Sequence, residues 1–412
     1  MLALHELTTQ IDRLTAIVDA ARPEPSGAVD SSKGPVEMSL ASMTPSPVTP
    51  AQTPPPLLTP AERHAPSSSS SSRDRRVSVL LPVKNGLPHL HEAIASLIHQ
   101  TYEDVEILVI DDGSDDGGPE EIQGRALSHV RVVPSNGRGV AAALNTGLRV
   151  ATGAFVARQD ADDWSHPERL ARQIEFLLRH PDIDAVATCA EFVDLESRPV
   201  ETAWTMDVRR RHDAVQTPEA LARVLPRTCA LHHGTLMARR DLLRQAGGYR
   251  AAFVGAQDYD LSLRLLPRAR FAKLPVRLYT YRVHDRQTSY QQRDEQRRAM
   301  IRARLEHVVR QVPRLTATNP RILLAAEPRT APIYIEMARD AGLALAEDAL
   351  LPAMPMPEPT SPTDLSSVDA LIIADADQGD PIDAWMTALD AAGDPDWHAV
   401  GICLVRPALI AA

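Results

Sequence analysis

The sequence predicts an α/β protein with an open, mostly parallel sheet and a second, smaller α/β unit toward its C-terminal end. Short apolar runs alternate with amphipathic stretches from Val77 onward, which is the order of strands and helices in β-α-β units. A similar alternation resumes after Pro320. With 412 residues, of which 44% are hydrophobic, the chain is long enough for two or three domains and apolar enough to fill a large core.

The elements of the larger unit follow one another in a regular order. Buried apolar runs predict strands over residues 77–83, 105–110, 130–133 and 154–158. Helical spacing of apolar residues predicts helices over 90–99, 139–151 and 167–180. In the second unit we expect strands over 322–325, 370–374 and 399–405, with helical stretches and a Pro-rich loop over 351–362 between them.

The segments that flank these units predict the domain organisation. Residues 1–22 have the spacing of a short amphipathic helix, which is compatible with a weak homo-oligomer and equally with a helix that docks on its own chain. Residues 23–74 are rich in Pro and Ser and lack periodic apolar residues, so we expect a disordered linker. A main domain over 75–312 and a small Rossmann-like α/β domain of unassigned role over 320–412 complete the prediction.

Composition argues against several classes of protein. A formal net charge of -10 offers no electrostatic footprint for nucleic acid. Cys189, Cys229 and Cys403 lack both CxxC spacing and a paired framework, which suits a reducing compartment. The sequence has neither an apolar stretch long enough to span a bilayer nor the core of a signal peptide. We therefore expect a cytoplasmic protein without a transmembrane segment, and peripheral binding at the inner membrane face stays open.

Polar residues follow three of the predicted strands at the point where each strand ends. The strand ends lead into KNG at 84–86, DDGS at 111–114 and DADD at 160–163. In open α/β sheets, ligands bind outside the carboxyl ends of the strands. Clustered carboxylates repel one another unless a cation compensates, and an Asp-x-Asp loop can hold Mg²⁺ or Mn²⁺ together with substrate phosphates. The sequence therefore predicts a divalent-metal site at this edge.

Seven segments resemble family 2 glycosyltransferases in their order and spacing. They are VSVLLPVKNG, ILVIDDGSDD, NGRGVAAALNTGLRVATG, ARQDADDWSHPERLARQ, LHHGTLMARRDLLRQAGGY, AQDYDLSLRL and YRVHDRQTS, and together they cover most of residues 77–289. The resemblance implies the GT-A fold, whose Rossmann-like sheet is mixed and mostly parallel. It also implies a nucleotide-diphosphate sugar as donor, Mn²⁺ or Mg²⁺ as cofactor, and a hexosyltransferase that inverts the anomeric centre.

The resemblance assigns donor and metal roles to individual residues. The residues that it places around the nucleotide are Pro82, Val83, Asn85, Asp111, Asp112 and Arg138. Asp160 would face the ribose or the metal, Asp162 would coordinate the metal that bridges the two phosphates, and His284 would reach the metal or the diphosphate.

The resemblance likewise assigns the base and the acceptor pocket. Inversion in one displacement requires a base opposite the leaving group, and Asp258 matches that position. Relatives more often have Glu-Asp where this chain has Gln257-Asp258, which leaves rate and acceptor choice open. His232, His233 and Gly234 would border the acceptor pocket, while Trp164 would either stack on a sugar ring or pack beside the following helix.

The sequence also bears on other functions. A catalytically weakened nucleotide-sugar-binding scaffold or regulatory protein remains an alternative, which Gln257 favours. Nucleotidyltransferases and dehydrogenases are disfavoured because no Gly-rich phosphate loop follows the first strand. Processive synthases carry a QxxRW segment and membrane helices, which this chain lacks, so we expect transfer of a single sugar. The sugar, the nucleotide and the acceptor stay open, the last among saccharides, lipid-linked saccharides, small molecules and proteins.

Overall fold

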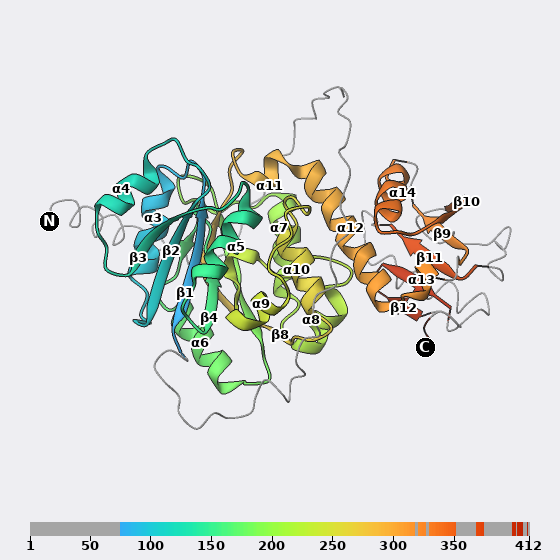
Figure 1. The fold of residues 1–412 in the computed structure, drawn as a ribbon, viewed down its shortest axis with the longest axis horizontal. Coiled ribbons are helices and arrows are strands. Elements are labelled where there is room, and N and C mark those ends of the chain that lie inside the picture. The colour runs from blue at the N-terminus through green and yellow to red at the C-terminus, as the bar shows by residue number, and fades with distance from the viewer. Residues whose placement is uncertain are drawn as a thin grey trace, which may run out of the picture. The chain divides into compact units, whose positions relative to one another are not determined.

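The computed structural model describes residues 75–317, 320–326, 329–351, 368–374, 398–400, 402–406 and 410. These residues form an eight-stranded and a five-stranded sheet with their helices (Figure 1). The predicted N-terminal helix and linker, and nearly all of the predicted Pro-rich loop, lie outside the described residues. The predicted domain boundaries therefore remain predictions.

The larger sheet is mixed and mostly parallel, as expected from the sequence. Its strand order is β3-β2-β1-β4-β7-β6-β8-β5, and β7 and β5 run against the other six strands. The strands are β1 (Val77–Val83), β2 (Val105–Asp111), β3 (Val130–Pro134), β4 (Phe155–Arg158), β5 (Trp164–Ser165), β6 (Ala185–Val193), β7 (Met237–Arg239) and β8 (Phe271–Arg282).

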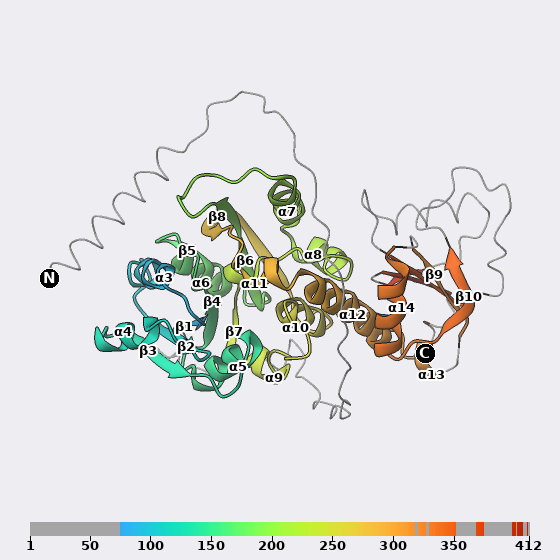
Figure 2. The ribbon, with the colours of Figure 1, turned by 90° about the horizontal axis from the view of Figure 1, so that it is seen from above.

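Helices cover both faces of this sheet (Figure 2). The helices of this part of the chain are α3 (His89–Ile98), α4 (Gly118–Gly124), α5 (Val140–Val150), α6 (Arg169–Arg179), α7 (Ala203–Asp213), α8 (Pro218–Val224), α9 (Arg240–Gln245), α10 (Gln257–Leu265), α11 (Thr288–Gln291) and α12 (Arg293–Gln311). The next helix, α13 (Arg314–Ala317), contributes Leu315 to the core of the smaller sheet. Side chains of α3 and α6 share one core with Val79 and Leu81 of β1, whereas α5, α9 and α10 share another with Leu80. Burial on both faces explains why β1 is apolar at every position except Ser78.

The smaller sheet has the strand order β10-β9-β11-β13-β12. Its elements are β9 (Ile322–Ala325), α14 (Ala331–Asp340), β10 (Leu345–Leu351), β11 (Ala370–Ile373), β12 (His398–Val400) and β13 (Cys403–Val405). The prediction of one strand over 399–405 is wrong, because β12 and β13 form an antiparallel hairpin in which His398 pairs with Val405. Two short apolar strands that follow one another closely have the same hydrophobic pattern as one longer strand, so the pattern alone does not show the turn between them.

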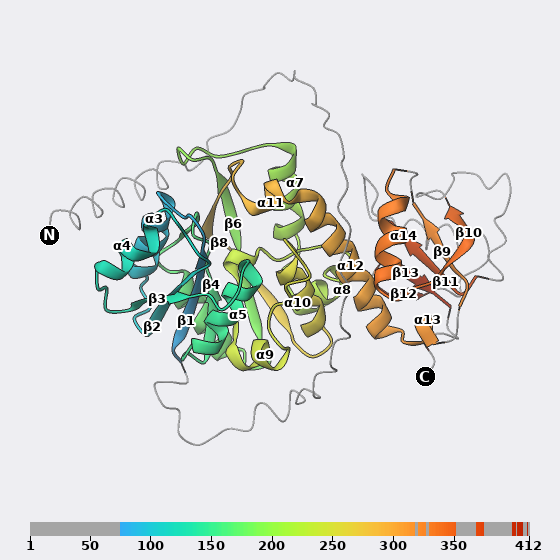
Figure 3. The ribbon, with the colours of Figure 1, turned by 45° about the horizontal axis from the view of Figure 1, so that its top comes forward.

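The long helix α12 has two apolar faces. Ala299 and Ala303 pack with Tyr259 and Leu263 of α10, and Figure 3 shows the two helices side by side. Ile301, with the apolar residues that follow it on the same face, belongs instead to the core of the smaller sheet. This double packing fixes α10, whose first turn carries Asp258.

Candidate functional site

The carboxyl ends of β1, β2 and β4 meet at one edge of the larger sheet. The three strands are parallel neighbours, with Val83 opposite Asp111 and Leu80 opposite Arg158. A Cβ atom added to Gly86 would lie 3.6 Å from the Cβ of Ala161, so the loop after β1 lies against the Asp160–Asp162 loop. The three polar strand ends are thus brought together, as the sequence predicted.

The loop after β1 is tied to the loop after β2. Asn85, whose φ is 54°, accepts a hydrogen bond from the Asp115 N–H at 2.9 Å and donates its own N–H to the Ser114 hydroxyl at 3.1 Å. Asp111 supports the same turn by accepting the Ser114 N–H at 2.8 Å. The Val83 side chain is buried in the core, so only its backbone borders this edge. Pro82, opposite Ile110, is partly buried.

Asp112 has one carboxylate oxygen bound and one without a partner. Oδ2 accepts the N–H of Gly139, the residue that precedes α5, at 2.8 Å. Oδ1 is buried and has no hydrogen-bond partner among the described residues, which is unusual for a buried acceptor. Arg138 is exposed beside Gly139, and its guanidinium likewise lacks a partner in the part of the chain that the structure describes. Both groups are therefore available to a ligand.

Asp160 is held by two partners that the sequence analysis did not single out. The Arg158 guanidinium donates to Asp160 Oδ1 at 2.6 Å. The Tyr279 hydroxyl accepts the Asp160 N–H at 3.1 Å and lies 3.4 Å from Oδ2. Because Arg158 and Tyr279 come from β4 and β8, the loop that begins at Asp160 is fixed to the sheet from two sides.

Asp162 faces His284 across the same edge. Its Oδ2 lies 3.0 Å from His284 Nε2, and its C=O accepts a hydrogen bond from Arg282 at 2.7 Å. Burial alone would raise the pKa of Asp162, but the hydrogen bond and charge of His284 outweigh it and hold that pKa below its ordinary value. Asp163 is fully buried, and burial together with the charges of Asp162 and Asp160 raises its pKa well above the usual range.

The donor set at this edge fits a divalent cation that arrives with phosphates. Asp162 and His284, whose Oδ2 and Nε2 atoms lie 3.0 Å apart, are the side chains that would hold it. The described residues contain no group of three or more His, Cys, Asp or Glu side chains that could hold a metal. A hard cation that takes one or two carboxylates plus substrate phosphates does not need such a group.

Asp258 is the second residue of α10 and belongs to the same electrostatic cluster. Burial raises its pKa to about 6, against the hydrogen bonds of the backbone N–H groups at the helix start and the charge of Arg158, while the charge of Asp160 adds to the rise. Asp258 is thereby poised to exchange a proton near neutral pH. Next to it, Gln257 is buried, and its amide oxygen has no partner among the described residues.

The two histidines predicted at the acceptor pocket are neutral near pH 7. Burial lowers the pKa of His232 to about 4 and, together with Arg158, that of His233 to about 3. His233 Nε2 lies 3.1 Å from the Tyr249 hydroxyl, and His232 Nδ1 has no partner in the described part of the chain. They can give or accept hydrogen bonds but supply no charge.

Gly234 and Trp164 lie in packed positions. A Cβ on Gly234 would come within 2.4 Å of the Tyr279 hydroxyl oxygen, so this glycine lets the Asp160 partner approach closely. Trp164 sits in β5 opposite Thr280 and exposes 8% of its surface, with its ring edge against His166. Neither side-chain position presents much surface to an acceptor.

Comparison with known proteins identifies the family of the domain that carries these residues. Residues 78–247 match the family model for glycosyl transferase family 2. This domain belongs to glycosyltransferase family 2. It is similar to the putative glycosyltransferase EpsE of Bacillus subtilis (strain 168), with 31% identity over 195 residues, which are 46% of this chain and 66% of EpsE. The O-antigen biosynthesis glycosyltransferase WbnJ of Escherichia coli is 28% identical over 222 residues, which are 52% of this chain and 81% of WbnJ.

The similarity covers only part of the related proteins. The first three curated relatives are matched over 66, 31 and 65% of their own lengths, less than two thirds in each case. A solved structure of Staphylococcus aureus TarS residues 1–349 in complex with UDP-GlcNAc has 17% identity and a TM-score of 0.49, over 65% of this chain and 80% of that one.

Three further residues of the glycosyltransferase domain shape the site and were missed from the sequence. Arg158 and Tyr279 orient Asp160, and Arg282 binds the Asp162 carbonyl and donates its N–H to Asp163 at 2.9 Å. Arg158 did carry a signal, because a charged residue at the end of a buried strand requires a partner. Tyr279 and Arg282 lie in a strand far along the chain, where sequence alone does not show the pairing.

Proposed function

We propose that this protein is a metal-dependent, inverting and non-processive hexosyltransferase that moves one sugar from a nucleotide-diphosphate sugar to an acceptor hydroxyl. The observation that carries the proposal is that Asp160, Asp162 with His284, and Asp258 belong to one cluster of interacting charges. EpsE and WbnJ are named as glycosyltransferases, which agrees with this reaction class.

The nucleotide diphosphate would bind between the loops that follow β1 and β2 and the start of α5. The unpaired Oδ1 of Asp112 can accept a hydrogen bond from the base or ribose, and the loop built by Asn85 and Asp111 would frame the ring together with Pro82 and the Val83 backbone. The free guanidinium of Arg138 suits the phosphates, which it can bind with two N–H groups at once.

Asp162 and His284 would hold Mn²⁺ or Mg²⁺, with Asp160 facing the ribose or the cation. Such a cation neutralises charge on the leaving diphosphate. The contribution of the chain is orientation. Arg158 and Tyr279 fix Asp160, and Arg282 fixes the backbone at Asp162, so the ligands are positioned before the donor arrives.

Asp258 would act as the general base. Its carboxylate takes the proton of the acceptor hydroxyl as the new C–O bond forms at the anomeric carbon and the bond to the diphosphate breaks on the opposite face. A pKa of about 6 keeps Asp258 ionised near neutral pH and makes it a stronger base than an ordinary Asp. His232, His233 and Gly234 would border the acceptor, whereas the burial of Trp164 favours a packing role.

The decisive experiment measures donor hydrolysis and transfer with UDP, GDP and dTDP sugars in the presence of Mn²⁺. We expect EDTA to abolish the activity and Asp258→Asn to lower it by about 10²-fold to 10⁴-fold, the usual contribution of a general base. Asp241→Asn is the matched control, because Asp241 is an exposed carboxylate on α9. Donor binding without turnover in the unaltered protein would favour the scaffold alternative, and no binding of any nucleotide sugar would refute both.

Location and assembly remain predictions. None of the helices that the structure describes is both long and apolar enough to cross a membrane. The cytoplasmic location, peripheral binding to the inner membrane face and an N-terminal oligomerising helix stay as expected from the sequence.

A further inference from the structure

A row of aromatic rings runs from the protein surface to the histidine pair beside the charged cluster. The Trp204 ring on α7 lies 6.1 Å from that of Phe192 on β6, in an edge-to-face arrangement. Phe192 lies 5.6 Å from Tyr281 and 6.0 Å from His232, and His232 lies 6.0 Å from Tyr279. These spacings fall within the range of favourable ring contacts. The row ends at Tyr279, the partner of Asp160.

The outer end of this row is rigid. Thr202 caps α7 by accepting the Thr205 N–H at 3.2 Å, and the Thr205 hydroxyl donates to the Val200 carbonyl at 2.8 Å. The Val200 N–H in turn donates to the Phe192 carbonyl at 2.9 Å. These bonds fix the first turn of α7, which carries Trp204, onto β6, and Figure 2 shows α7 on the β6 and β8 side of the sheet.

The other end of α7 is tied to the histidine loop. Lys273 on β8 exposes only 4% of its surface, and its ammonium donates to the Ala230 carbonyl at 2.7 Å and to the carbonyl of His212. His212 is in the last turn of α7, and Ala230 lies two residues before His232. The surface helix and the loop that borders the candidate site are therefore held in one fixed arrangement.

Despite this rigidity, the outer face of the row is open to solvent. Trp204 is 45% exposed and its neighbour Met206 is 57% exposed, whereas Phe192 behind Trp204 is 3% exposed. An aromatic side chain that is fixed in place and half exposed loses little further conformational freedom when a flat apolar ligand binds to it. The C–H face of a sugar ring is such a ligand.

The charges around Trp204 argue against a membrane as the ligand of this surface. Arg210 and Arg211 both pair with Asp207, at 2.7 and 2.8 Å, and Arg209 lies 3.9 Å from Glu201. A surface that binds anionic lipid headgroups needs unpaired basic residues. These three arginines face two carboxylates, which leaves one net positive charge, far fewer than the about four to eight basic residues of a cluster that binds anionic lipid. A neutral polar ligand with an apolar face therefore fits better.

We infer that Trp204, backed by Phe192, is a stacking platform for a sugar ring of the acceptor, and that the acceptor is therefore a saccharide. The inference rests on the proposed function and narrows its acceptor class. The ring on Trp204 would lie outside the ring whose hydroxyl reaches Asp258, because Phe192 and His232 separate the two positions. Disaccharide acceptors should therefore depend on Trp204 more than monosaccharide acceptors do.

The test compares Trp204→Ala and Trp204→Phe with the unaltered protein, using p-nitrophenyl monosaccharides and disaccharides as acceptors. We expect Trp204→Ala to raise the KM of a disaccharide acceptor about tenfold, equivalent to about 1.4 kcal/mol, and to leave donor hydrolysis and donor KM unchanged. Trp204→Phe should restore most of the affinity. Leu178→Ala is the control, because Leu178 on α6 is a comparably exposed apolar residue, at 43%.

Each other outcome has a defined meaning. An unchanged disaccharide KM in Trp204→Ala, or a donor-hydrolysing protein that transfers to none of the glycosides, would overturn the saccharide platform while leaving donor chemistry intact. Loss of binding to phosphatidylglycerol vesicles in Trp204→Ala, with unchanged kinetics on soluble glycosides, would instead identify a membrane contact. Absence of donor binding in the unaltered protein would count against the proposed function itself.

Discussion

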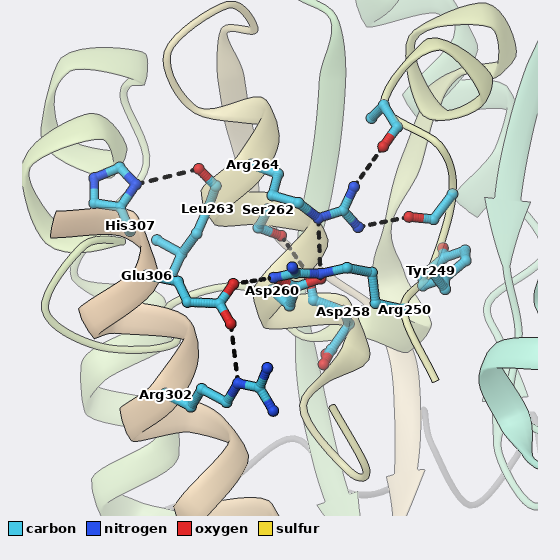
Figure 4. Close-up of polar contacts among 12 residues, drawn as sticks. Tyr249, Arg250, Asp258, Asp260, Ser262, Leu263, Arg264, Arg302, Glu306 and His307 are labelled. Atoms are coloured by element: carbon cyan, nitrogen blue, oxygen red, sulfur yellow. Dashed lines mark hydrogen bonds and ion pairs between the residues drawn. The ribbon is translucent and has the colours of Figure 1, made fainter. Parts of the chain in front are cut away.

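Asp260 is predicted to be the residue on which the position of α10 most depends. It is fully buried, two residues after Asp258, and accepts hydrogen bonds from Arg250 at 3.0 Å and from Arg264 at 3.0 Å (Figure 4). Arg250 also binds Glu306 of α12 at 2.7 Å. Two guanidinium groups thus converge on one buried carboxylate, and Arg250 also links this carboxylate to α12.

Asp260→Asn removes the charge but keeps the size of the side chain. Breaking a buried ion pair on one side costs about 3 to 5 kcal/mol, because the remaining charge loses its partner. Arg264 keeps its bonds to the carbonyls of Ala246 and Gly248, and Arg250 keeps Glu306, so we expect a loss near the lower limit, about 3 kcal/mol. Urea denaturation measures this loss, and kcat should fall because the first turn of α10 carries Asp258.

Glu306→Gln is the matched comparison. Glu306 is more exposed, at 17%, and its partners Arg302 and Arg310 reach solvent, so we expect a loss of only about 1 kcal/mol. If Asp260→Asn lowered the free energy of unfolding by no more than Glu306→Gln, the buried carboxylate would not be the centre of this network and the reasoning would be refuted.

Two further predictions concern the site. Gly234→Ala should lower the free energy of unfolding by about 1 to 3 kcal/mol and reduce activity, because the added Cβ displaces the Tyr279 hydroxyl from Asp160. Gly124→Ala is the control, because a Cβ there meets no atom within 4 Å. Equal melting temperatures for the two variants would contradict this view. The transfer rate should fall as the pH drops through about 6, because Asp258 is then protonated. Since the folded state raises this pKa from 3.8, the stabilising contribution of Asp258 is present at low pH and lost as the pH rises through about 6. Relative to the unaltered protein, Asp258→Asn should therefore stabilise the fold increasingly as the pH rises above 3.8, with the full gain above about 6, and a melting temperature that is lowered there would disprove the assignment.

Much of the larger sheet could be predicted from the sequence because its early strands are buried on both faces. β1 and β2 are mostly apolar, and the residues that follow them had to lie at the same sheet edge once the strands were parallel. Short strands were harder. β5 has two residues and β7 has three, too few for any periodic pattern to reveal them.

In the candidate site, residues within sequence motifs could be predicted, whereas their partners from distant parts of the chain could not. Asp160, Asp162 and Asp258 stand in motifs that resemble family 2 glycosyltransferases, so their positions were accessible. The residues that orient them could not be predicted from the sequence. Tyr279 is separated from Asp160 by more than 100 residues, and its hydroxyl reaches the Asp160 backbone only because Gly234 leaves room for it. Such a contact depends on three segments of chain at once, and no single segment carries a signal for it.

Arg158 explains how so many carboxylates can lie close together before any donor binds. Its buried guanidinium pairs with Asp160 and also lowers the pKa of Asp258, of Asp162 and of His233. Arginine suits this position because it does not lose its proton when buried, as a lysine would. Arg169, which is also buried, interacts with Asp160 and Asp163, so more than one buried guanidinium group faces these carboxylates. In the proposed function, a divalent cation would offset the charge of the diphosphate beside these carboxylates.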